Sequence, residues 1–156
     1  MKLIAHRGLV NGPDKKSENQ PDVIQSALSA GFDCEVDLWV TDSQLYLGHD
    51  EPQYKITTEF IVTSGLWIHA KNLDALSWLT TSAYSTSMNY FWHQEDDYVI
   101  TSHGHIWAYP GKETNSQCVI VMPELQDPTL VSVTGAVCYG ICSDYVNEIR
   151  RHLSLK

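Results

Sequence analysis

The sequence predicts an α/β fold, because short apolar runs alternate with segments of helical periodicity. A length of 156 residues allows one domain with a substantial core and is too short for two ordinary ones, so we expect a single domain over residues 1–156. A hydrophobic fraction of 43% and a charged fraction of 19% are typical of a globular chain. Clusters of polar residues follow several apolar runs, which places the candidate functional groups at strand ends.

The first strand and helix are predicted from the residues that bound them. Residues 3–5 form a short apolar run that ends at polar His6. Residues 21–30 place apolar side chains on one helical face, with Pro21 at the start and Gly31 just after the end, the usual asymmetry of helix termini. The first 30 residues therefore predict a strand, a loop and a helix.

Strands and helices continue to alternate as far as residue 79 and then give way to closely spaced strands. Up to that point we expect strands at 32–40 and 44–48, a short helix at 57–62, a strand at 66–70 and a helix at 73–79 capped by Asn72. The later strand candidates are 90–93, 98–101, 105–109, 118–122 and 139–142, and only the last leads into a helix, at 145–153. The middle of the chain is too short for regular strand–helix repeats.

Charge and composition disfavour several classes of protein. The formal charge of −9 argues against a nucleic-acid partner, because phosphate backbones require a basic surface and the chain has only 10 Lys and Arg. We find no apolar segment typical of a signal peptide, and no run approaches the ~18 residues of a membrane span. The four cysteines lie singly in apolar segments and are expected to be reduced core residues. A cytoplasmic protein is therefore expected.

Four polar clusters stand where predicted strands end, and each alone has an ordinary structural explanation. Residues two apart on a strand share a face, so Glu35 and Asp37 would bring two carboxylates together, which a divalent cation would balance. The alternatives are a solvated acidic strand face, a hydrogen-bonded His49 and a salt bridge of Arg7. Co-occurrence at strand ends favours a functional site. The clusters are His6-Arg7-Gly8, Glu35-Val36-Asp37, His49-Asp50 and His69-Ala70-Lys71.

Four short motifs also occur in a fixed order within about the first 50 residues. They are Ile4-Ala5-His6-Arg7-Gly8, Glu18-Asn19, Gly31-Phe32-Asp33-Cys34-Glu35-Val36-Asp37 and Gly48-His49-Asp50. In this order and spacing they resemble the opening of the glycerophosphodiester phosphodiesterases, which belong to the phospholipase C-like phosphodiesterase superfamily.

This resemblance implies metal-assisted cleavage of a phosphodiester on a TIM-type barrel. His6 and His49 would be the acid/base pair, and Arg7 would hold the phosphate. Glu35 and Asp37 would be metal ligands. Because such barrels need ~200–250 residues, we expect a reduced TIM-type (β/α) barrel with several helices shortened to loops. Its wall would be open or completed by a second copy in a homo-oligomer.

One strand departs from the family pattern of an acid, one residue and then a lysine. This chain keeps the lysine, Lys71, which we expect to bind substrate, but has His69 in the place of the acid. His69 is either the third metal ligand or a hydrogen-bond partner of a carboxylate. As a ligand it would shift the preference for one divalent ion from the family's Mg²⁺ or Ca²⁺ toward Mn²⁺, Zn²⁺ or iron.

The second half offers weaker candidates for the mouth of the site, each with a core, loop or cap role as the alternative. They are His93, Trp107, Tyr109, Glu124 and Asp144.

Three function classes follow from these residues. The leading one is a soluble phosphodiesterase for a small or head-group-sized, glycerophosphodiester-like substrate. Its rival is a catalytically degenerate barrel that binds a phosphorylated glycan or lipid head group without cleaving it. A third, a lyase or transferase, would stop at a cyclic phosphate.

Overall fold

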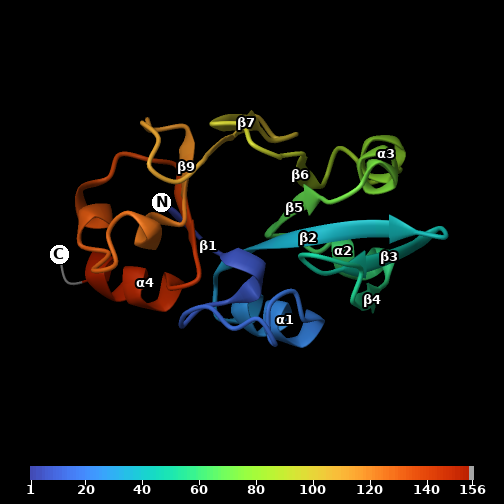
Figure 1. Ribbon diagram of the computed structural model, residues 1–156, viewed down its shortest axis with the longest axis horizontal. Helices are drawn as coiled ribbons and strands as arrows, with labels where there is room; N and C mark the ends of the chain where they lie inside the picture. The colour runs from blue at the N-terminus through green and yellow to red at the C-terminus, as the bar shows by residue number, and fades with distance from the viewer. Residues whose placement is uncertain (155–156) are drawn as a thin grey trace.

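The computed structural model describes residues 1–154, which form one ten-stranded sheet and four short α-helices (Figure 1). The strands are β1 Lys2–Ala5, β2 Asp33–Thr41, β3 Gln44–Leu47, β4 Tyr54–Ile56, β5 Leu66–Ala70, β6 Asn89–Phe91, β7 Tyr98–Ile100, β8 Ile106–Ala108, β9 Cys118–Val121 and β10 Gly140–Ser143. The helices are α1 Pro21–Ser29, α2 Thr58–Ile61, α3 Leu73–Thr81 and α4 Val146–Ser154. None of the helices in the described part of the chain has the length and apolar character that a membrane crossing requires.

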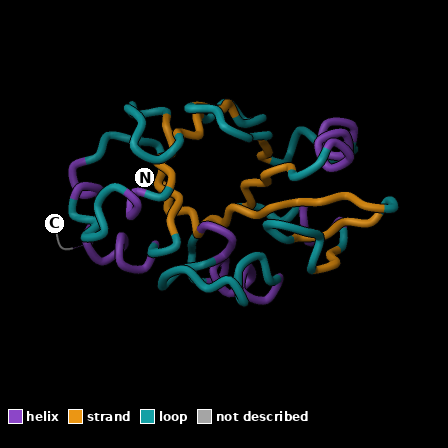
Figure 2. Tube along the Cα trace, in the orientation of Figure 1, coloured by secondary structure: helices purple, strands orange, loops and turns teal. Residues whose placement is uncertain are grey.

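Most of the sheet is parallel, so the carboxyl ends of its strands share one rim. The neighbours in order are β8, β9, β10, β1, β2, β5 and β6, all parallel, whereas β2–β3–β4 and β8–β7 are antiparallel. Figure 2 shows that the sheet curls round, giving a half-barrel. Its two sides are linked by the turn after β7, where Ser102 N donates a hydrogen bond to Tyr90 O (2.8 Å).

The expected reduced TIM-type (β/α) barrel is wrong. Such a barrel alternates parallel strands with helices, whereas this chain forms a strand-rich mixed sheet in which β7 runs antiparallel to β8. Residues 92–117 explain the difference, because they contain Gly104, Pro110 and Gly111 and no apolar face long enough for a helix. The chain therefore connects β6, β7, β8 and β9 with loops and a hairpin.

Individual elements were predicted more successfully than their assembly. The predicted strands and helices overlap observed ones, and Asn72 caps α3 by accepting a hydrogen bond from Ala75 N (2.9 Å). The sequence analysis missed β4 and three 3-10 helices, His6–Gly8, Pro123–Leu125 and Ser132–Gly135. Local signals were therefore sufficient for most elements.

Apolar cores lie on both faces of the sheet. One packs between the sheet, α1 and α3, and contains buried Ile24, Val36 and Leu79. The other fills the inside of the curl, where Trp67 and Trp107 lie with ring centroids 5.9 Å apart. Because side chains alternate along a strand, the buried polar residues of β2 point toward the inside of the curl, on the opposite face from Val36.

Candidate functional site

All seven site residues predicted from the sequence line one cavity of about 500 Å³ at the carboxyl-end rim of the parallel strands. They come from the turn after β1, from β2, from the loop after β3 and from the end of β5. Sequence positions up to 65 residues apart are thus brought together by the strand order and by the turns after β1 and β3. The residues are His6, Arg7, Glu35, Asp37, His49, His69 and Lys71.

The turn after β1 is held in a strained conformation that ties it to β2. Arg7 has φ 52°, a left-handed conformation that L side chains rarely adopt, and its backbone N–H donates to Glu35 Oε2 (3.2 Å). Gly8 follows at φ 81°, and a Cβ there would lie 2.9 Å from Cγ1 of Ile24. The tight turn therefore allows no side chain at Gly8 and sets His6 and Arg7 at the cavity.

Asp37 is the most heavily partnered group of the site. Its side chain is 1% exposed, and Oδ1 lies 3.1 Å from His69 Nδ1 and 3.5 Å from Lys71 Nζ. Oδ2 accepts a hydrogen bond from Asn19 Nδ2 (2.9 Å) and lies 3.2 Å from Arg7 Nε. Burial alone would raise the pKa of this carboxyl, but the hydrogen bond from His69 and the two cationic neighbours outweigh it and hold the pKa well below its usual range.

Glu35 lies beside Asp37 but is shifted in the opposite direction. It is 3% exposed, and within residues 1–154 its one hydrogen bond comes from Arg7 N. Burial and then the charge of Asp37 raise the pKa of Glu35 above its ordinary value. A buried, weakly satisfied carboxylate of this kind gains most from a nearby positive charge.

Glu35, Asp37 and His69 could hold a metal ion, because one ligand atom from each lies within 4.8 Å of the others. The donor set fits a divalent cation, with two carboxylates and one imidazole. The ring of His69 is fixed from its far side, since Nε2 lies 3.2 Å from the backbone oxygen of His93. His69 therefore contacts a carboxylate, as one sequence alternative predicted, while staying within reach of a metal at the same point.

His6 is oriented by an acidic residue from the last strand. Its Nδ1 lies 2.8 Å from Asp144 Oδ1, which turns Nε2 toward Glu35 (4.0 Å). Burial lowers the pKa of His6, but the hydrogen bond to Asp144 and the charge of Glu35 outweigh it, and the net shift is upward. Asp144 is itself held by Glu124, which accepts hydrogen bonds from Asp144 N (3.0 Å) and Ser143 Oγ (2.8 Å).

His49 reaches the cavity from a loop that needs a glycine. Gly48 has φ 154°, and a Cβ there would lie 2.1 Å from the backbone oxygen of Glu51. Trp39 Nε1 donates to Gly48 O (2.7 Å), and His49 Nδ1 lies 2.7 Å from Asp50 Oδ1. The imidazole is the more exposed of the two predicted acid/base residues, at 35% against 15% for His6.

Two supporting residues were quoted from the sequence without a role. Asn19 is fully buried and exchanges two hydrogen bonds with Asp37, while Glu18 Oε2 accepts one from Arg7 Nη1 (2.8 Å). Asn19 has φ 62°, a conformation that asparagine tolerates better than most residues. Of the weaker candidates, His93, Trp107 and Tyr109 line the cavity, and Glu124 and Asp144 stand behind it.

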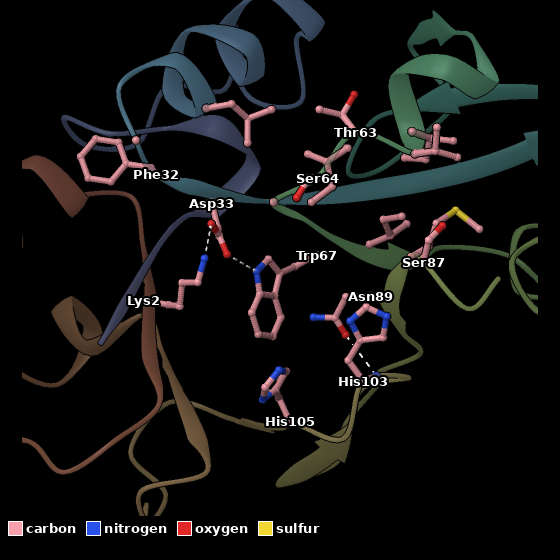
Figure 3. A pocket seen from close by; sticks show the side chains of 18 of the residues that line it. Lys2, Phe32, Asp33, Thr63, Ser64, Trp67, Ser87, Asn89, His103 and His105 are labelled. Carbon is pink, nitrogen blue, oxygen red and sulfur yellow. Dashed lines mark hydrogen bonds and ion pairs between the residues drawn. The ribbon is translucent and has the colours of Figure 1, made fainter. Parts of the chain in front are cut away.

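A second cavity, of about 610 Å³, opens at the opposite rim, where the parallel strands begin (Figure 3). The carboxylate of Asp33 is already paired there with Lys2 Nζ (3.0 Å) and accepts a hydrogen bond from Trp67 Nε1 (3.1 Å). Asn89 accepts one from His103 N (3.4 Å). Because these polar groups largely satisfy one another, the carboxyl-end cavity is the stronger candidate for chemistry.

Comparisons of the chain with protein-family models, with curated proteins and with solved structures gave no match. The functional argument therefore depends on the side chains of the carboxyl-end cavity and their chemistry.

Proposed function

We propose that this protein is a metal-dependent phosphodiesterase that hydrolyses a small or head-group-sized diester resembling a glycerophosphodiester. The observation that carries the proposal is the meeting, in one cavity of about 500 Å³, of seven residues chosen for this chemistry from separate motifs. They comprise a metal-capable triad, two further histidines and two cations. The volume is typical of a pocket for a small molecule.

The proposed cofactor is one divalent cation held by Glu35, Asp37 and His69. Metal-bound histidines commonly donate the second ring nitrogen to a carbonyl, and His69 Nε2 lies within hydrogen-bond distance of such an oxygen. The two carboxylates suit Mg²⁺ or Ca²⁺, while the imidazole raises the relative affinity for Mn²⁺, Zn²⁺ or iron. When bound, the cation would stabilise negative charge on the phosphoryl oxygens.

His6 and His49 are the proposed acid/base pair. One imidazole takes the proton of the attacking hydroxyl while the other gives a proton to the leaving alcohol. Asp144 acts as a positioning residue, because its bond to Nδ1 of His6 leaves Nε2 free to exchange a proton in the cavity.

Arg7 and Lys71 are the proposed phosphate-binding residues. Both line the cavity and both contact Asp37, so the two cations lie on either side of one carboxylate. Glu18 fixes the guanidinium of Arg7 through Nη1. Charge growing on the phosphoryl oxygens would be stabilised by these preset cations.

The test is turnover of glycerophosphodiesters in the presence of Mg²⁺, Ca²⁺, Mn²⁺ or Zn²⁺. We expect His6→Ala and His49→Ala each to reduce kcat by about 10²–10⁴-fold, the usual range for loss of a general acid or base. His152→Ala is the matched control, because this histidine lies on α4 and pairs only with Glu148 (3.7 Å) in the described structure. Activity that survives both site substitutions would exclude the proposed acid/base pair.

A binding module without turnover is the second candidate, and one observation favours it. Asp37 is satisfied by Asn19, Arg7, His69 and Lys71 without any metal. Calorimetry of a glycerophosphodiester with protein kept in a chelator separates the two functions, because a module binds there and gives no product with any metal. Phosphorus NMR of the product separates a hydrolase from a lyase or transferase that stops at a cyclic phosphate.

A further inference from the structure

The mouth of the carboxyl-end cavity is divided into a polar half and an apolar half. The polar half comes from β1, β2 and β5 with the loop after β3, and holds every residue assigned to catalysis, metal or phosphate. The apolar half comes from β6, β8, β9 and the 3-10 helix Pro123–Leu125. Following the strand order round the curl, β8 lies across from β2. The apolar half consists of Phe91, Trp107, Tyr109, Pro110, Val121, Met122 and Leu125.

The floor of the apolar half begins directly beside the metal-capable triad. The ring of Phe91 stacks on the ring of His69, with centroids 5.1 Å apart and planes 4° from parallel. Trp107 continues the floor, with its ring centroid 4.7 Å from that of Phe91. Both are buried, at 4% and 6% exposed, so this floor is largely shielded from water. Because Phe91 stacks directly on His69, a group attached to a phosphate at the triad would lie close to aromatic carbon.

The rim of the apolar half exposes large apolar side chains to solvent. Tyr109 is 48% exposed and Leu125 63% exposed, and both line the cavity. Leu125 is placed there by a strained turn, because Met122 has φ 48° and its N–H donates to Cys142 O (2.8 Å). Strained non-glycine residues concentrate at ligand sites, where the surrounding fold holds them in place.

His93 and Gln94 add polar groups to the cavity lining beside this half. The Nδ1 atom of His93 is buried and has no hydrogen-bond partner within residues 1–154. The seven residues of the apolar half include no Asp, Glu, Lys or Arg. Such a surface gains little from a small, strongly hydrated alcohol such as glycerol.

We propose that the diester cleaved at this site carries one apolar ester group, an alkyl chain or an aryl ring, which lies on the apolar half of the mouth. The inference rests on the proposed phosphodiesterase function and names its substrate class. The phosphate occupies the polar half between the two cations, and the apolar ester group crosses Phe91 and Trp107 toward Tyr109 and Leu125. A purely polar diester would leave the apolar half of the mouth exposed to water.

The test uses monomeric glycerophosphate esters with methyl, butyl, hexyl or phenyl as the second alcohol, each with the metal that supports turnover. We expect kcat/KM to rise from methyl to hexyl by about twofold to fourfold for each methylene that is buried. A gain with hexyl or with phenyl supports the apolar ester group, and the comparison of the two separates a chain from a ring. A flat or falling series overturns this inference and leaves the phosphodiesterase intact, whereas absence of turnover for every ester overturns both.

Two substitutions at the rim test whether the preference for an apolar ester group comes from the apolar half. Tyr109→Ser and Leu125→Gln should each reduce the hexyl-to-methyl ratio of kcat/KM by about threefold to tenfold, because each removes apolar surface that the ester group would contact. Val137→Gln is the matched control, since Val137 is 69% exposed and lies outside the cavity lining. The ratio should stay at the wild-type value in the control. An unchanged ratio in both rim variants overturns the assignment of the ester group to this half.

Discussion

Replacing Asn19 by alanine tests whether the polar site is built on a buried asparagine. The side chain lies wholly inside the protein and forms two hydrogen bonds with one residue. Nδ2 donates to Asp37 Oδ2 (2.9 Å), and Oδ1 accepts from Asp37 N (3.0 Å). The backbone of Asn19 is also held, because its N–H donates to Arg7 O (2.9 Å) and φ is 62°. One substitution therefore removes two bonds and leaves a left-handed backbone.

The expected loss of unfolding free energy is large for a single polar side chain. Losing the bond to an ionised carboxylate costs about 1.5–3 kcal/mol, and losing the bond to the neutral N–H costs about 1 kcal/mol. Alanine in the left-handed region adds about 1 kcal/mol of backbone strain. We expect Asn19→Ala to lose about 4 kcal/mol, which at this chain length corresponds to a fall in Tm of about 8–16 °C.

Urea unfolding followed by tryptophan fluorescence measures this loss directly, because the chain contains 5 tryptophans. Asn19→Gly removes the same side chain but tolerates the positive φ, so it should be about 1 kcal/mol more stable than the alanine variant. Asn11→Ala is the surface control, with one exposed bond to Asn147, and should lose no more than about 0.5 kcal/mol. A loss below about 1 kcal/mol in Asn19→Ala, or a glycine variant less stable than the alanine one, would refute the reasoning.

Two further predictions concern the metal preference and the acid stability. His69→Glu should restore a third carboxylate and shift binding from Mn²⁺ or Zn²⁺ toward Mg²⁺ or Ca²⁺ in competitive titrations, and an unchanged order of affinities excludes His69 as a ligand. Asp127 accepts hydrogen bonds from the Thr129 hydroxyl and from Ser132 N, which hold its pKa well below the ordinary 3.8. A lowered folded-state pKa stabilises the protein above the unfolded value, and this stability is lost as pH falls toward the folded one. Asp127→Asn should therefore lower Tm at pH 6, and its difference from wild type should shrink steadily as pH falls below about 4, whereas a difference that stays constant down to pH 2 contradicts this.

Local sequence signals were sufficient to predict a feature wherever the interacting residues lie within one short segment. The cap at Asn72 and the alternation that puts Glu35 and Asp37 on one face need only neighbouring residues to be recognised. Three of the four polar clusters meet because parallel strands end at one rim, whereas His49 reaches the same rim from the loop after β3, which runs antiparallel to β2. These signals located the candidate site before the shape of the sheet was known.

Partners that are distant in sequence gave no such signal. Asp144 reaches His6 across 138 positions, and nothing near either residue indicates the pairing. The reversal of β7 is a local feature by contrast, because the turn between Ile100 and Ile106 is too short for a crossover and strands joined by such a turn run antiparallel. The sequence analysis predicted the closely spaced strands of this half, but it did not predict that β7 and β8 pair as a hairpin within one mixed sheet.

The charge of the cavity lining bears on how a metal ion and a phosphodiester would bind together. Within a chain of formal charge −9, the site sets Arg7 and Lys71 against Glu35 and Asp37, so its fixed charges cancel. A site without net charge exerts little electrostatic attraction on a phosphodiester anion. A bound divalent cation would make the net charge of the same site positive. Binding of the cation and binding of the diester would then be linked, and each ligand would raise the affinity of the protein for the other by the same factor. On the proposed function, a phosphodiester would therefore bind most tightly to the metal-loaded protein, and contacts with the apolar half would add to the binding energy.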